Sequence, residues 1–149
     1  MKKILVSVVI SISLYFVFSG AVPAVLGAEG LRPVEQSQAY QEFLKKPEND
    51  LSRMICLLNY LRDEPIMVRY EGIDYTAQAA YPFGLVYLMT NYHNENPEDW
   101  AKKHCYRSLF SNSIILFKFQ DGSSRPARDV ILEKYHELEA AQKKRASRV

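Results

Sequence analysis

Cysteine and histidine are scarce in this chain, and their scarcity removes several classes of functional site. Cys56 and Cys105 are the two cysteines of the sequence. They do not form a C-x-x-C pair, which excludes a dithiol redox motif and a zinc ribbon. The sequence also lacks a G-x-S-x-G motif, the nucleophile turn of an α/β-hydrolase. No recognisable catalytic motif therefore points to a reaction.

Metal ligands are equally few. The three histidines are His93, His104 and His136. Glu133 and His136 have the Glu-x-x-His spacing of di-metal helix bundles, but such a site needs two copies of the motif and further carboxylates. One copy is present, so we expect no metal site and no cofactor.

Charge is absent from Ile4–Ala28, a run that follows Lys2 and Lys3 and is rich in Ile, Leu, Val and Phe. A basic start, an apolar stretch and then small residues are typical of a secretory signal peptide. We expect residues 1–28 to be this signal peptide, so that the mature protein is periplasmic or secreted and contacts no membrane after signal removal. The alternative is an N-terminal anchor, because the run is about as long as the ~20 residues that span a bilayer.

The chain carries 19 Lys and Arg against 17 Asp and Glu. Removal of the signal peptide takes away Lys2 and Lys3 and no acidic residue, so the remainder is formally neutral. A neutral chain has no long-range field that attracts nucleic acid, which we therefore exclude as a partner. Residues 143–149 form a basic C-terminal tail, and we interpret its cations as favourable charges at the end of a last helix.

Composition and caps then divide the mature chain. Residues 29–48 contain Gly30, Pro33 and Pro47 and few apolar side chains, and we predict an N-terminal arm. A single domain is expected over residues 49–142.

Helix starts within this domain are marked by capping residues. Asn49, Thr76 and the Asn96–Pro97 pair each precede a segment with helical spacing of apolar residues. Pro82 lies inside the second of these segments, which predicts a kink or a late start. A last helix is expected to open at Ser124–Pro126.

Strands are predicted at residues 66–70 and 73–75, joined by a tight turn at Glu71–Gly72. Residues 114–120 alternate apolar and less apolar side chains and are predicted as a further strand. The sequence thus predicts an α+β fold, with about four helices packed on a small antiparallel sheet of about three strands.

Four short motifs follow one another along this domain: Met67–Ala77 with Ala79–Ala80, Pro97–Trp100, Ser108–Ser113 and Phe119–Gly122. Their order and spacing resemble a family of small exported bacterial proteins known only as a domain of unknown function. The resemblance covers roughly residues 50–138 and implies the α+β fold and the exported location. The family has no established activity, so the resemblance implies none for this chain.

The candidate binding residues are polar side chains within these motifs: Arg69, Tyr75, Ser108, Ser111 and Ser113. Because we expect the first and last strands to be adjacent, we expect Arg69 to lie near the three serines. A guanidinium among hydroxyls suits a carboxylate or a glycan. The structural alternative is that Arg69 holds a helix C-terminus and the serines cap and turn the chain.

The two cysteines and a set of four aromatic side chains each allow two interpretations. Cys56 and Cys105 are expected on helices that pack together, where they either form a disulfide or stay free and buried. The second group consists of aromatic side chains with mixed helical spacing: Tyr81, Phe83, Tyr87 and Tyr92. They form either a sugar-stacking strip or part of the core, and the core is the default.

These observations predict an exported, non-enzymatic binding or interaction module whose partner is an envelope protein or a glycan. The alternative is a small envelope hydrolase, or a hydrolase inhibitor, that uses the Ser108–Ser113 loop near Arg69. A hydrolase needs a base within hydrogen-bond reach of one serine. A binding module needs only a recognition surface.

Overall fold

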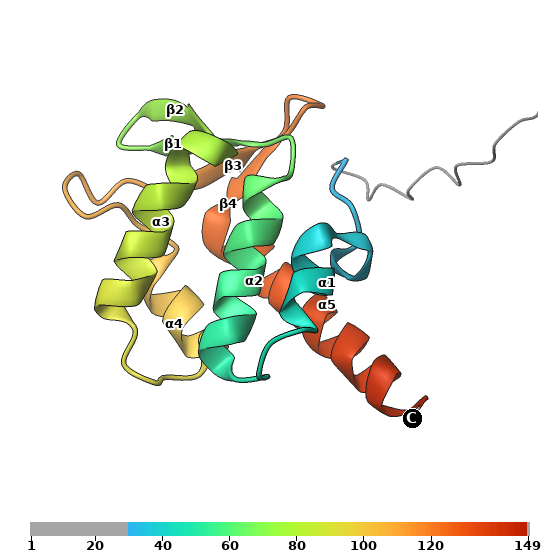
Figure 1. The fold of residues 1–149 in the computed structure, drawn as a ribbon. Coiled ribbons are helices and arrows are strands. Elements are labelled where there is room, and N and C mark those ends of the chain that lie inside the picture. The colour runs from blue at the N-terminus through green and yellow to red at the C-terminus, as the bar shows by residue number, and fades with distance from the viewer. Residues whose placement is uncertain (1–29, 149) are drawn as a thin grey trace, which may run out of the picture.

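The computed structural model describes residues 30–148, and the expected signal peptide at residues 1–28 lies outside them. The described chain folds into five α-helices, one 3-10 turn and one antiparallel sheet of four strands. The fold is α+β, as predicted (Figure 1). The helical elements are η1 (Val34–Gln36), α1 (Gln38–Phe43), α2 (Asp50–Arg62), α3 (Ala77–Asn91), α4 (Pro97–His104) and α5 (Ala127–Ala146).

Local capping chemistry sets the start of three helices. Asn49 and Ser52 form a reciprocal capping box at α2, in which each side chain accepts a hydrogen bond from the other residue's backbone N–H. Thr76 caps α3, and Asn96 caps α4 with Pro97 in the first turn. All three predicted caps are confirmed. They could be predicted from the sequence because a cap depends only on residues within one turn.

The sheet has the strand order β2-β1-β3-β4. Strands β1 (Met67–Tyr70) and β2 (Ile73–Thr76) form the predicted hairpin, with Glu71 and Gly72 at positive φ in its turn. Strand β3 (Leu116–Lys118) pairs with β1 on the other side, which confirms that these strands are adjacent.

The fourth strand, β4 (Ser124–Pro126), replaces the expected start of the last helix. The turn at Asp121–Gly122, where Gly122 has φ +85°, sends the chain back so that residues 124–126 pair with β3. Pro126 has no N–H to donate, which an edge strand tolerates. Helix α5 therefore begins at Ala127, one strand later than predicted.

Residues 31–44 belong to the core, so the prediction of an N-terminal arm over 29–48 is wrong for this part. The segment buries Leu31, Val34, Ala39, Tyr40 and Phe43 against α2 and α5. Its apolar side chains are few, as the sequence indicated, but η1 and α1 direct them to one side.

Polar contacts fix the same segment to the domain. The Tyr60 hydroxyl donates to the Arg32 carbonyl at 2.6 Å, and Arg32 Nε donates to the buried carboxylate of Glu64 at 2.8 Å. The backbone N–H of Val34 donates to the Glu137 carboxylate of α5. These contacts connect residues about 30 and 100 positions apart, which sequence spacing does not reveal.

Helix α2 lies between two hydrophobic clusters. The larger cluster joins α1, α2, α5 and the sheet, and the smaller one joins α2, α3 and α4 around Met54, Leu88 and Trp100. Figure 1 shows α2 between α3 and α1, which explains why α2 is apolar on two faces.

Helix α3 is uncharged from Ala77 to Asn91 and runs through Pro82 without a break, so it does not start late. Ala77 and Leu88 are its fully buried residues. Its outer face exposes Phe83, Val86 and Met89 by 75%, 66% and 56%. A helix that is apolar all round is normally covered on every side. The exposure of this outer face is therefore unusual.

Lys143, Lys144 and Arg145 of the predicted basic tail lie in the last turn of α5, where cations oppose the negative end of the helix dipole. Lys144 and Arg145 also pair with Glu35 and Glu48 of the N-terminal segment. None of the helices between residues 30 and 148 combines the length and apolar character needed to cross a bilayer.

Candidate ligand-binding cavity

Arg69 binds Asp74 rather than the predicted serines. Its Nε and Nη2 donate to the two carboxylate oxygens of Asp74 at 2.7 and 3.1 Å, and Lys118 Nζ donates to the same carboxylate at 2.6 Å. Hydrogen bonds from Arg69 and then Lys118 lower the pKa of Asp74 to about 2. No hydrogen bond joins Arg69 to the three serines in the described chain, because the register places Asp74 opposite Arg69.

The three serines instead bond to one another. Ser108 Oγ lies 3.0 Å from Ser113 Oγ and 3.2 Å from Ser111 Oγ, and it accepts the backbone N–H of Ser113. Arg107 donates to the carbonyl of Asn112, which has φ +56°. This bonding matches the structural alternative, in which the serines shape the loop.

Glu71 is the hairpin residue that contacts the serine loop, and sequence reasoning missed it. Its carboxylate accepts the backbone N–H groups of Phe110 and Ser111 at 2.9 to 3.2 Å. Hydrogen bonds from the Ser111 and Ser108 hydroxyls and from these two amides lower the pKa of Glu71 to about 2. Nothing local in the sequence indicates this role, because the loop lies about 40 residues away.

We expect Glu71→Gln to loosen the 108–113 loop, because a neutral amide oxygen accepts hydrogen bonds more weakly than a carboxylate. In the unchanged protein, the depressed pKa means that the loop is fully held above the ordinary value of 4.5 and is released as the pH falls toward 2. Hydrogen-exchange protection of the Phe110 and Ser111 amides should follow this course. In Glu71→Gln it should be lower at neutral pH and independent of pH in this window.

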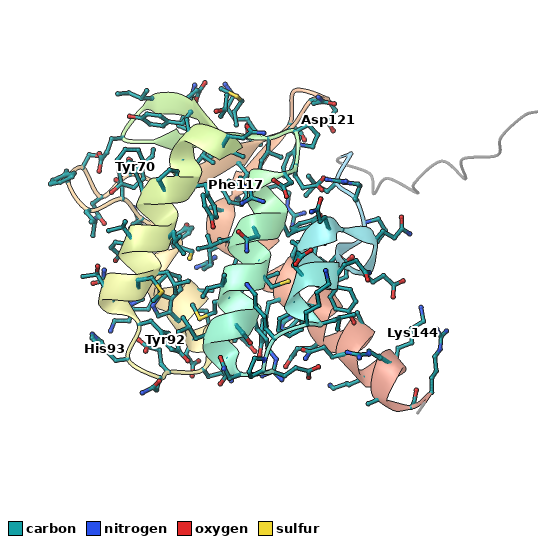
Figure 2. All side chains as sticks on the ribbon, in the orientation of Figure 1. Tyr70, Tyr92, His93, Phe117, Asp121 and Lys144 are labelled. Atoms are coloured by element: carbon teal, nitrogen blue, oxygen red, sulfur yellow. The ribbon has the colours of Figure 1, made fainter. Side chains whose placement is uncertain are left out.

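The matched control is Asp121→Asn, which removes a carboxylate from the other loop; Figure 2 labels Asp121. There the Asp121 carboxylate accepts the backbone N–H of Ser123 at 2.8 Å. Protection of Phe110 and Ser111 should not change in this variant. Equal protection in Glu71→Gln and the unchanged protein would contradict the anchoring role of Glu71.

A cavity of about 540 Å³ lies between the helices and the inner face of the sheet. This volume is within the range of about 300 to 1,000 Å³ that is usual for small-molecule sites. Figure 2 labels Tyr70 and Phe117, which come from β1 and β3 and mark the sheet side of the cavity. The other walls include Leu58 of α2, Phe83, Gly84 and Leu88 of α3, Trp100 and His104 of α4, Leu109 and Phe110 of the serine loop, and Ile131 of α5.

The surface of the wall is mostly apolar, although Arg62, Arg107 and five tyrosines also line it. Two polar atoms of α4 are covered by this lining. Trp100 Nε1 and His104 Nε2 are buried and have no hydrogen-bond partner within the described residues. The two rings pack against each other with centroids 4.9 Å apart. A buried N–H without an acceptor costs about 1 to 3 kcal/mol, so an acceptor atom placed here would be stabilised.

Tyr87 is the hydrogen-bond partner of His104 and so influences which ring nitrogen carries the proton. Its hydroxyl lies 2.9 Å from His104 Nδ1, and its ring packs edge-on against Trp100. Burial, followed by the nearby charge of Lys103, lowers the pKa of His104. The imidazole is therefore neutral at neutral pH, and it presents an Nε2–H donor when the Tyr87 hydroxyl donates to Nδ1.

The predicted aromatic strip is divided between wall and core. Tyr81, Phe83 and Tyr87 line the cavity, as does the predicted site residue Tyr75. Tyr92 packs against the smaller hydrophobic cluster. Tyr87 and Tyr92 thus pack against the smaller hydrophobic cluster, as the default supposes, whereas Phe83 is 75% exposed.

Cys56 and Cys105 are both free, so the disulfide alternative is wrong for this structure. Cys56 lies in the larger cluster, with its Sγ 3.6 Å from the Ala39 carbonyl, and Cys105 lines the cavity. Burial raises the pKa of each thiol to about 12. Both cysteines are therefore protonated and poorly nucleophilic at neutral pH.

Residues 30–148 contain no group of three or more His, Cys, Asp or Glu side chains that could hold a metal ion. Of the Glu-x-x-His pair, Glu133 binds Arg125 at 2.9 Å. His136 lies 3.5 Å from Glu98 of α4 on the surface. The two side chains thus have separate partners.

Comparisons with protein-family models, curated proteins and solved structures found no match for this chain. The cavity is therefore the basis of the proposed function.

Proposed function

We propose that the protein is an exported binding module for a small apolar ligand that carries a hydrogen-bond acceptor at one end, such as a fatty acid. The observation that carries this proposal is the cavity of about 540 Å³, in which the apolar wall is interrupted at Trp100 and His104 of α4. An acyl chain would fill the apolar part, and its carboxylate would accept from the two ring N–H groups after the side chains that cover these atoms move aside.

This proposal narrows the partner classes expected from the sequence. A glycan carries polar groups on all sides, whereas the surface of the cavity wall is mostly apolar. The hydrolase alternative loses its support, because the carboxylate beside the serines belongs to Glu71. A pKa of about 2 makes Glu71 a poor base at neutral pH.

We expect cis-parinaric acid, a fluorescent fatty acid, to bind the purified protein saturably. Trp100 is the single tryptophan of the chain and lines the cavity, so its fluorescence should be quenched by energy transfer to the bound probe. A concentration of 100 times the Kd adds about 2.7 kcal/mol of stability. This corresponds to a rise in Tm on the order of 10 °C for a domain of this size.

Gly84 provides a matched pair of variants. A Cβ at this position would meet Leu58 Cδ2 at 3.6 Å, an ordinary contact, so Gly84→Ala should keep probe binding. Gly84→Leu extends the side chain into the space between α2 and α3 and should weaken binding by about tenfold or more, equivalent to about 1.4 kcal/mol. The proposal is wrong if the unchanged protein shows no saturable binding, or if the folded Gly84→Leu variant binds like Gly84→Ala.

A further inference from the structure

The outer face of α3 and the tip of the serine loop form one exposed apolar surface, which we call the α3 surface. It consists of Phe83, Val86 and Met89 of α3 together with Leu109 and Phe110 of the loop. Leu109 is 63% and Phe110 is 88% exposed. Figure 1 shows the loop projecting beside α3 on the same side of the molecule. Large exposed apolar patches of this kind mark interaction sites.

The α3 surface is continuous with the cavity. Phe83, Leu109 and Phe110 are exposed to solvent and also line the cavity wall. Whatever covers the α3 surface therefore lies at the entrance through which an apolar ligand would pass.

The chemistry of α3 suits an apolar partner. The helix has no charged residue, and two polar side chains near its end are bonded to their own helix. Thr90 Oγ1 donates to the Val86 carbonyl at 2.8 Å, and Asn91 Nδ2 donates to the Tyr87 carbonyl at 2.9 Å. Protein interfaces carry about one hydrogen bond per 100 to 200 Å², whereas hydrocarbon requires none.

The cavity entrance favours lipid over a second copy of the chain, because an apolar ligand that passes through it dissolves in a bilayer. Shallow insertion into lipid has no threshold of buried area, because each inserted side chain contributes separately.

We propose that the α3 surface lies on a lipid bilayer and that the cavity exchanges its ligand directly with the lipid phase. This proposal rests on the proposed function for the identity of the ligand, and it departs from the expectation of no membrane contact. Val86 and Met89 would insert into the hydrocarbon boundary beside Phe83. Phe110 would insert from the loop, and Glu71 would hold that loop in place through the Phe110 and Ser111 amides.

The test is flotation of the purified protein with vesicles of phosphatidylcholine alone, a lipid without net charge. We expect the protein to float with the vesicles, and to do so equally at about 1 M salt, where the Debye length is about 3 Å. Val86→Glu should weaken vesicle binding by about tenfold or more, because it places a charge at the lipid boundary. Val86 does not line the cavity, so binding of cis-parinaric acid in the absence of vesicles should be unchanged.

Ala140→Glu is the control, because it adds the same charge to an exposed position on α5. It should change neither vesicle binding nor probe binding. The docking proposal is overturned if the unchanged protein stays with the aqueous fraction, if Val86→Glu floats normally, or if the protein is a dimer that Val86→Glu converts to a monomer. Flotation without probe binding would overturn the proposed ligand and leave the docking surface intact.

Discussion

Replacing Val34 by aspartate is expected to unfold the domain or to lower its Tm by more than about 10 °C. Val34 has no exposed surface, and its backbone N–H already donates to the Glu137 carboxylate. The new carboxylate would be buried without a cation and close to a like charge. An uncompensated buried charge costs several kcal/mol, a large part of the 5 to 15 kcal/mol that stabilises a typical domain.

Thermal denaturation followed by circular dichroism measures this effect. Gln36→Asp is the matched control, since it adds the same charge two residues away on an exposed side chain of η1. Its Tm should stay within a few degrees of the unchanged protein. A Val34→Asp variant that melts cooperatively at the original Tm would contradict the finding that residues 31–44 belong to the core.

Leu88→Ala is expected to destabilise the protein by about 3 kcal/mol, within the usual 2 to 5 kcal/mol for a buried leucine. Leu88 is 1% exposed and packs with Met54 and Trp100 in the cluster that holds α3 to α2 and α4. It also lines the cavity, so its truncation adds empty volume to an existing space. Urea denaturation should show a lower midpoint with an unchanged slope.

The neighbouring Met89→Ala serves as the control, because Met89 is 56% exposed and lies on the outer face of α3. Its free energy of unfolding should change by less than about 0.5 kcal/mol. If the two variants were equally stable, the smaller cluster would not be what holds α3 in place. A fatty acid that occupies the cavity should raise the midpoint of Leu88→Ala, since binding to the folded state stabilises it.

Sequence reasoning succeeded where the physics is local. The caps at Asn49, Thr76 and Asn96 were predictable, because a side chain that accepts an N–H two or three residues away needs no tertiary contact. The hairpin was predictable for the same reason, from the tight turn at Glu71–Gly72. Ser124–Pro126 has the local chemistry of a helix start, but pairing with β3 overrides it.

The site was harder to predict, because its residues are brought together by contacts that are distant in sequence. The alternation of β1 places Tyr70 at the cavity wall, and the register places Asp74 opposite Arg69. Arg69 therefore pairs with Asp74 and does not line the cavity. It was the one charged side chain among the predicted binding residues. Trp100 belongs to the Pro97–Trp100 motif, but the sequence did not show that it lines a cavity.

By itself, the sequence determined the α+β class, three of the helix starts and the pairing of β1 with β2 and β3, because these follow from caps, turns and side-chain periodicity within short segments. Only the tertiary structure decided that residues 31–44 are core, that both cysteines are free, and that Glu71 anchors the serine loop. It also decided that the helices and the sheet line a mostly apolar cavity that is open to solvent. The physical reason is that burial and enclosure depend on how separate elements pack, and the local pattern of each element is compatible with several packings.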